Sequence, residues 1–302
     1  MEALNQAHRD GVVKGLKDVA GVADRLDVDE LLVKHPETFN LFCLALSELM
    51  SEPESKDTMG YFQLAGIHGL PKALWDGVDA NSKHSGGYGY CAHSRPTFPP
   101  WHRPYLAMVE QTLFLKMRDI AETFPEASKS AYREAAQQFR LPYWDYYRPR
   151  GEHTVFPGVF GNGKTSFKYD FSVPQIFTVD QIVLRTPEKG NELELRNNPF
   201  RLFDFPSVGS IPEREWSIVG QDSANFSRQQ TQRYPFSPDP LKSMNDAINK
   251  NRESGVAQIL NMVSDLAYKD YDAFAHDTAA TPSSGSLEGS KSTLRGSPSP
   301  SG

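Results

Sequence analysis

Cysteine is nearly absent from this sequence, because Cys43 and Cys91 are the only two in 302 residues. Two cysteines allow one bridge at most, which excludes a disulfide framework as the main source of stability. Long apolar runs are also missing, and Met1 to Lys17 mixes polar and charged side chains. The sequence therefore predicts neither a membrane span nor a secretory leader, and we expect an intracellular, cytoplasmic protein.

Charge of one sign does not accumulate either. The 32 basic and 38 acidic residues give a formal charge of −6, and no basic block interrupts this balance. Nucleic acids and anionic membranes attract clustered basic residues, so we expect neither as a partner. A chain of this length can bury a core without a partner, and a small neutral substrate suits its charge better.

Helical periodicity is the clearest structural signal. From Pro36 to Met50 apolar residues recur at spacings of three and four, which predicts an amphipathic helix. Helical composition returns from Glu126 to Phe139 and from Pro240 to Ala275, with an expected break near Gly255. Pro142 to Pro235 is rich in Pro, Gly and Asn and should carry short strands at most. The sequence predicts a mainly α fold with long irregular loops.

One further predicted helix carries a histidine. It should begin near Trp101, because Pro99 and Pro100 favour extended backbone before it. Helical spacing places His102 on one face with the apolar residues Leu106, Val109, Leu113 and Met117. We therefore expect His102 to point into the helical bundle.

Three histidines fall close together in the sequence. His68 lies in Gly66–Pro71, His93 follows Cys91 by two positions, and His102 opens the helix just described. Imidazole is a favoured ligand of copper, zinc, iron and nickel, and histidines on facing helices often hold such an ion. A histidine near an apolar face can equally be a hydrogen-bonded core residue. Spacing alone leaves both interpretations open.

The segments around these histidines resemble the copper A motif of fungal tyrosinases. They are Gly66–Pro71, Cys91-Ala92-His93 and Phe98–Arg103. Further matches are Leu141–Asp145 with the family's Pro-Tyr-Trp-Asp motif, Asn198–Phe200 with its Asn-Pro-Leu turn, and Thr231–Pro235 with its Arg-Tyr-Pro segment. The likeness runs, with gaps, from about Leu26 to Gly289.

This resemblance implies a tyrosinase-like helical bundle and a set of copper ligands. His68, His93 and His102 would bind the first copper of a pair. Cys91 matches the cysteine that in fungal relatives forms a thioether with the histidine two positions later, and a free thiol beside the site is the alternative. Such a tether would fix the orientation of its imidazole before the metal arrives.

The resemblance also implies a reaction. Tyrosinases are copper oxidoreductases that use O2 to hydroxylate monophenols and to oxidise o-diphenols to o-quinones, in melanin formation or related phenol metabolism. Phe98 and Trp101 would supply apolar walls beside the copper. Asp145 would support the structure or orient a ligand.

The family's reaction uses two coppers, and the second ligand set begins with a His-x-x-x-His pair. After His102 the sequence contains two histidines, His153 and His276. Ser286–Gly289 resembles the segment that precedes the pair, but Lys291 and Arg295 stand where histidines are expected. We therefore expect a truncated chain that holds at most one complete copper site and lacks full activity.

We divide the sequence into residues 1–281, a partial tyrosinase copper-binding central domain, and residues 282–302, a disordered tail of mainly Ser, Gly and Pro. A bundle that is incomplete at its C-terminal end should leave the faces of Phe39–Met50 and His102–Met117 without partners. Each large apolar side chain left exposed forgoes about 1.5–3 kcal/mol. This predicts low solubility or partial order.

Two other interpretations stay open. The chain could be a non-catalytic paralogue that keeps one metal ion or none and has a binding or regulatory role. An oxygen carrier of the haemocyanin type is less favoured, because Cys91-Ala92-His93 is of the fungal tyrosinase type. Metal content and oxidation of an o-diphenol would separate these interpretations. The oligomeric state is left open by the sequence.

Overall fold

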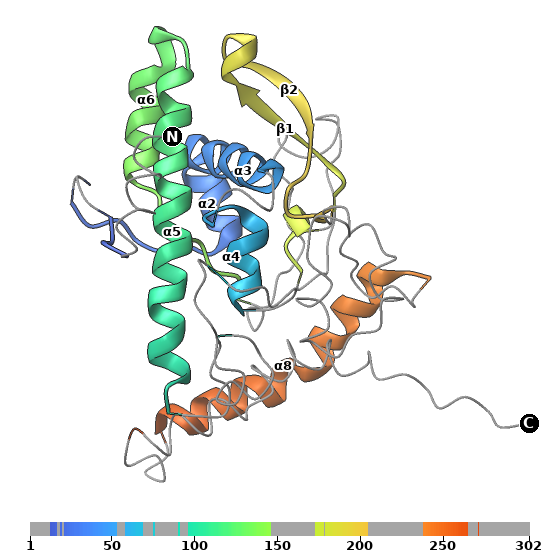
Figure 1. Cartoon of the computed structure of the whole chain (residues 1–302). Coiled ribbons are helices and arrows are strands. Elements are labelled where there is room, and N and C mark those ends of the chain that lie inside the picture. The colour runs from blue at the N-terminus through green and yellow to red at the C-terminus, as the bar shows by residue number, and fades with distance from the viewer. Residues whose placement is uncertain are drawn as a thin grey trace, which may run out of the picture.

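The computed structural model describes residues 13–16, 19, 21–52, 58–68, 75, 90, 96–145, 173–177, 179–204, 238–264 and 271. These residues form six α-helices and one antiparallel hairpin (Figure 1). The helices are α2 (Val28–Lys34), α3 (Pro36–Ser51), α4 (Tyr61–His68), α5 (Phe98–Thr123), α6 (Glu126–Gln137) and α8 (Pro240–Ser264). The strands are β1 (Gln181–Thr186) and β2 (Glu192–Asn197). The prediction of a mainly α fold is confirmed.

Helices α2 and α3 follow each other with one residue between them, and local chemistry explains both starts. The Asp27 side chain caps α2 by accepting the amide of Asp29 at 3.0 Å. Helix α3 begins at Pro36, a position where the missing N–H of proline has no intrahelical partner to lose. The predicted helix from Pro36 to Met50 is confirmed within one residue.

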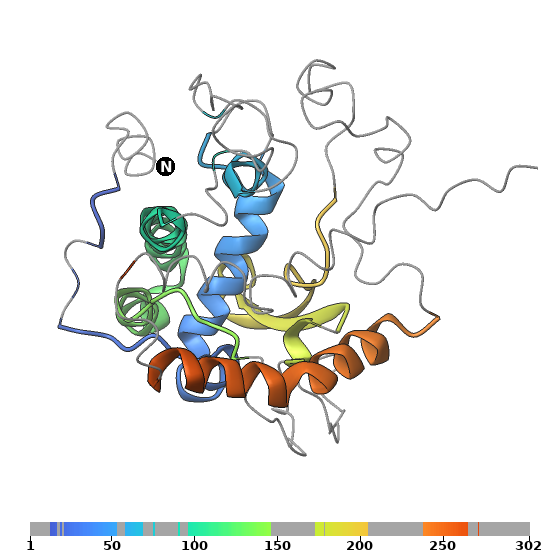
Figure 2. The same ribbon diagram turned by 90° about the horizontal axis from the view of Figure 1, so that it is seen from below.

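Helix α3 forms the centre of the core. It packs against α2, α4, α5, α6 and β1, and α5 lies beside α6 (Figures 1 and 2). The four largest side chains that this packing buries almost completely are Phe39, Phe114, Phe124 and Phe139. Cys43 on α3 is a free thiol in this core, and burial raises its pKa well above the ordinary value.

The expectation that the apolar faces of α3 and α5 lack partners is wrong for most of both helices. Phe39 and Leu49 on α3 are 1% and 3% exposed, and Leu113 and Met117 on α5 are 2% and 0% exposed. Helices α3, α5 and α6 bury these residues against one another. Leu106 is the exception at 48% exposed, although Tyr105 before it and Met108 after it pack against this core.

The hairpin covers another side of α3. Ile182, Leu184 and Thr186 point from β1 into the core, and the Asn40 side chain holds the backbone of Arg185 through two hydrogen bonds of 2.8 and 2.9 Å. The turn between the strands needs Gly190, which has φ +65°. The predicted irregular region thus contains two paired strands, each of six residues.

Some predicted boundaries are wrong. Helix α8 continues through Gly255 to Ser264, because one interior glycine costs a helix only about 1 kcal/mol. Helices α2 and α4 were not predicted, since short helices show too few repeats of their period. The described helices include none with the length and apolar character of a membrane span. The predicted domain boundary at residue 282 lies outside the described residues.

Candidate metal centre

The site begins at the end of α4. Its residues Phe62, Leu64 and Ile67 are buried, and α4 packs against α3. His68 is the last residue of α4, so its position follows from this packing.

The second contributor is the start of α5. The helix begins at Phe98 and not near Trp101, and it contains Pro99, Pro100 and Pro104. The prediction of extended backbone at Pro99 and Pro100 is wrong, because the first amides of a helix have no intrahelical acceptor and proline loses nothing there. His102 therefore lies in the second turn of α5.

The two histidines meet through their ring nitrogens. The Nε2 atoms of His68 and His102 are 3.0 Å apart, and the ring centroids are 5.1 Å apart at an interplanar angle of 69°. His102 Nδ1 lies 2.7 Å from the carbonyl oxygen of Phe98. A carbonyl oxygen can only accept, so this contact places the proton of a neutral His102 on Nδ1. The lone pair of His102 Nε2 then faces His68.

This arrangement fits a metal ion. A histidine nitrogen lies about 2.0–2.1 Å from an ion such as zinc, so two nitrogens on one ion must be within about 4 Å of each other. The 3.0 Å between the Nε2 atoms of His68 and His102 meets this limit. The Phe98 carbonyl contacts the other nitrogen of the His102 ring, the position that second-shell partners occupy in metal-bound histidines.

Aromatic side chains enclose the pair. The ring of Trp101 lies 4.9 Å from His102 and 6.1 Å from His68, and the ring of Phe98 lies 4.2 Å from His102. Tyr105 stacks on His68 at 5.7 Å and 17°. Phe98 and Trp101 thus lie beside the histidines, where the sequence interpretation put them as apolar walls.

The third histidine and the cysteine of the predicted site, His93 and Cys91, lie outside the described residues. Among the residues that the structure does describe, no three His, Cys, Asp or Glu side chains form a group that could hold a metal ion. The structure therefore brings together His68 and His102, and the ligand roles of all three histidines and the thioether of Cys91 stay predictions.

Of the remaining histidines, His35 is described, and His8, His84, His153 and His276 are not. His35 stands at the junction of α2 and α3. Its backbone amide donates to the Leu31 carbonyl and its carbonyl accepts from the Phe39 amide. Its place in the fold is structural.

Asp145 contributes through its backbone. Its amide donates to the Oδ2 atom of Asp27 at 3.0 Å, and the neighbouring Tyr143 pairs with the chain around Asp27 as an isolated parallel bridge. Asp27 is completely buried, and sequence reasoning did not single it out. The sequence does contain a pattern that marks Asp27, because an aspartate just before an apolar helical segment is a typical N-cap.

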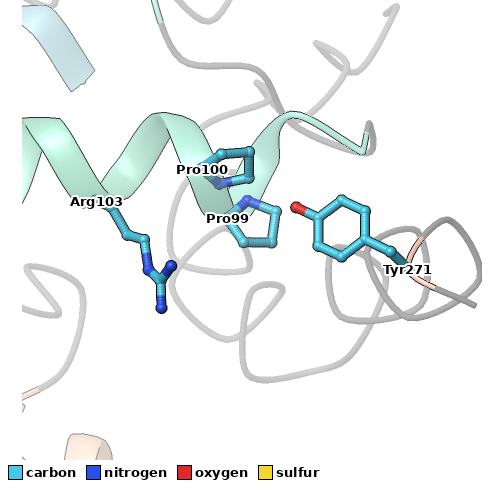
Figure 3. A pocket seen from close by; sticks show the side chains of 4 residues that line it. All are labelled: Pro99, Pro100, Arg103 and Tyr271. Atoms are coloured by element: carbon cyan, nitrogen blue, oxygen red, sulfur yellow. The ribbon is translucent and has the colours of Figure 1, made fainter.

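A pocket lies beside the site on the flank of α5. Pro99, Pro100 and Arg103 line it together with Tyr271 (Figure 3). The Tyr271 hydroxyl donates to the Pro96 carbonyl oxygen at 2.8 Å and so connects the segment after α8 to the chain just before α5. In Figure 1 α8 accordingly lies toward the end of the molecule where α5 begins.

Comparisons with known proteins identify the family of this chain. The family described as the common central domain of tyrosinase matches residues 58–290. A tyrosinase of Podospora anserina is 34% identical over 279 residues, which are 87% of this chain and 43% of that protein. A tyrosinase of Neurospora crassa is 33% identical over 271 residues, 84% of this chain and 34% of that protein. The chain thus spans less than half the length of either relative.

The fold is also that of a solved tyrosinase. An oxygen-bound mutant of Aspergillus oryzae pro-tyrosinase superimposes with a TM-score of 0.61 at 25% identity, over 79% of this chain and 42% of that one. Its likeness confirms the predicted tyrosinase-like helical fold. Because the family match covers well over half of its residues, this chain belongs to the tyrosinase family.

Proposed function

We propose that this chain binds copper through His68, His93 and His102. We propose further that it forms part of a tyrosinase-type oxidoreductase that acts on phenols with O2. The observation that supports this most directly is the approach of His68 Nε2 to His102 Nε2 at 3.0 Å, with the Phe98 carbonyl behind His102. Membership of the tyrosinase family supports copper as the metal.

The chain's own residues would prepare the site in three ways. The Phe98 carbonyl holds the proton of His102 on Nδ1, so that Nε2 keeps its lone pair. Trp101 and Phe98 keep water from one side of the imidazoles. A thioether between Cys91 and His93 would fix the third imidazole before metal binds. Bound copper would supply the redox chemistry toward O2 that these side chains lack.

The proposed reactions are the hydroxylation of monophenols and the oxidation of o-diphenols to o-quinones, in melanin or related phenol metabolism. These reactions use two coppers in the family. His153 and His276 are the two histidines that follow His102 in the printed sequence. We therefore propose one copper ion for these 302 residues, and phenol oxidation only where further histidines complete a second site.

A second candidate function follows from that same histidine count. With one metal ion and no second site, the chain would be a non-catalytic member of the family with a binding or regulatory role. Copper content and oxidation of a simple o-diphenol distinguish the two. Quinone formation once further histidines complete a second copper site supports the oxidase, whereas a chain that still shows no turnover after this completion supports the second candidate.

The metal site itself is tested by copper content per chain after gel filtration. Wild type should retain about one equivalent, and His68→Ala and His102→Ala should each lose most of it, since each removes a ligand. His35→Ala is the matched control, because His35 lies at the α2–α3 junction. Equal copper content in wild type and both ligand variants would refute the site.

A further inference from the structure

Tyr105 lies beside His68 and contacts three groups around the site. Its hydroxyl donates to the Leu64 carbonyl oxygen at 3.0 Å. Its ring stacks on His68 at 5.7 Å and 17°, and on Trp101 at 5.4 Å and 26°. Tyr105 belongs to α5, whereas Leu64 and His68 belong to α4. One side chain of α5 therefore holds the last turn of α4 at two points.

These two points define where His68 can lie. Leu64 precedes His68 by four residues, so in a regular α-helix its carbonyl is the acceptor of the His68 amide. The hydroxyl of Tyr105 thus hydrogen-bonds to the same helical turn that carries His68. The stacked ring then limits rotation of the His68 imidazole, because a near-parallel pair at this distance is the preferred aromatic geometry.

The two ligands are consequently oriented by different means. His102 is oriented from within its own helix by the Phe98 carbonyl, four residues earlier. His68 ends its helix, and its ring rests on a residue of the opposite helix. Tyr105 follows His102 by three residues, so the helical geometry of α5 fixes the distance between the residue that holds His68 and the second ligand.

We propose that Tyr105 is the positioning residue of His68, and that it sets the distance between the two ligand nitrogens before a metal ion arrives. This inference rests on the proposed function, since it assigns Tyr105 to the same copper site. It adds a residue that neither ligates metal nor reacts. Removing a second-shell partner of a metal ligand typically weakens metal affinity about 10- to 100-fold.

The test uses two variants and two matched controls. Tyr105→Phe removes the hydroxyl and keeps the ring, and Tyr105→Leu removes both. Tyr132→Phe is the control for the hydroxyl, because Tyr132 donates to the Asn191 Oδ1 atom at 3.1 Å, away from the site. Phe114→Leu is the control for the ring, because Phe114 is buried on the same helix, about two and a half turns farther along.

Two readouts are measured on the full chain. The first is Cu²⁺ affinity by competition with a chelator, together with the electron paramagnetic resonance spectrum of the bound Cu²⁺. The second uses the metal-free protein labelled with ¹³C-histidine, in which the ring carbons of His68 report the stacked aromatic directly. We expect Tyr105→Leu to weaken Cu²⁺ binding about 10- to 100-fold. It should also change the Cu²⁺ spectrum and shift the His68 ring signals.

Tyr105→Phe should weaken Cu²⁺ binding about 2- to 10-fold, as expected for one hydrogen bond, and should keep the His68 ring shifts. Both controls should bind Cu²⁺ within about twofold of wild type. If Tyr105→Leu does not fold, Tyr105→Phe tests the proposal instead. It should then show weaker Cu²⁺ affinity and faster hydrogen exchange of the His68 backbone amide than wild type.

The proposal is overturned if Tyr105→Leu binds Cu²⁺ as wild type does and leaves the His68 ring signals unchanged. It is also overturned if the controls weaken binding as much as the Tyr105 variants, because the effect would then reflect general stability. If wild type binds no Cu²⁺, the proposed function fails, and the spectra of the metal-free protein alone decide whether Tyr105 positions His68.

Discussion

Asp27 offers the sharpest test of how this fold is held together. Its carboxylate is completely buried and accepts two backbone amides, Asp29 through Oδ1 and Asp145 through Oδ2, both at 3.0 Å. One side chain thus caps α2 and anchors the end of the segment Leu141–Asp145, which lies more than 100 residues away in sequence. Replacing Asp27 with alanine removes both acceptors and leaves the Asp145 amide without this partner.

The expected cost follows from these two contacts. Loss of an N-cap costs about 0.5–2 kcal/mol, and a buried amide that loses its acceptor costs about 1–3 kcal/mol. Asp27→Ala should therefore lower the free energy of unfolding by roughly 2–4 kcal/mol, a large part of the 5–15 kcal/mol typical of a domain. Asp27→Asn keeps one acceptor oxygen but turns its NH₂ toward one of the two amides. Its free energy of unfolding should therefore fall by about half as much as that of Asp27→Ala.

Urea unfolding measures this difference. With a slope of about 2 kcal/mol per molar urea, Asp27→Ala should lower the midpoint by about 1–2 M at unchanged slope. Asp24→Ala is the control, because Asp24 lies three residues earlier and is exposed. Hydrogen exchange at the Asp145 amide should accelerate in Asp27→Ala alone. Equal midpoints for the Asp27 and Asp24 variants would refute the anchoring role.

Three further predictions concern Tyr132, Gly190 and Asn198. Burial raises the pKa of Tyr132 to about 12, so the folded state keeps a proton that the unfolded state loses above about pH 10. The stability that this proton contributes should be present below pH 10 and fall between about pH 10 and 12, and urea midpoints of Tyr132→Phe should lack this fall. Gly190→Ala should lower the free energy of unfolding by about 1–2 kcal/mol, because Gly190 has φ +65° and no atom lies within 4 Å of an added Cβ. A smaller decrease in Gly190→Asn would support this conformational cause, and an unchanged free energy in the alanine variant would contradict it. The Asn198 side chain accepts from the Phe200 amide and donates to the carbonyl oxygens of Ile176 and Val179. Asn198→Ala removes these three bonds and should lower the free energy of unfolding, measured by thermal unfolding, by about 2–4 kcal/mol. Asn198→Asp should lower it further, since a carboxylate would face two carbonyl oxygens, and an aspartate variant as stable as wild type would argue against these bonds.

The fold could be predicted where a long segment shows one period. Helix α3 has four turns of apolar residues at helical spacing, and its predicted bounds were right to one residue. Helix α5 was predicted to start too late, because proline signals both extended backbone and a permitted first turn, and sequence alone does not choose between them. The same ambiguity applies to Gly255, where α8 tolerates the glycine.

The burial of α3 and α5 was predicted wrongly for a related reason. An apolar stripe shows that a face needs a partner but does not say which helix supplies it. Helices α3, α5 and α6 supply one another's partners, so Phe39 and Met117 are buried within the described residues. Leu106 remains exposed on α5 although its neighbours Tyr105 and Met108 pack against this core.

By itself, the sequence determined the residue types and motifs of this protein: the mainly helical class, the three candidate histidines and the resemblance that family membership confirmed. Only the tertiary structure decided which groups meet. His68 and His102 are 34 positions apart and lie on different helices. Their nitrogens approach to 3.0 Å because α4 packs on α3 while α3 packs on α5, and because Tyr105 joins α4 to α5. Such contacts depend on packing across the chain, which local periodicity does not encode.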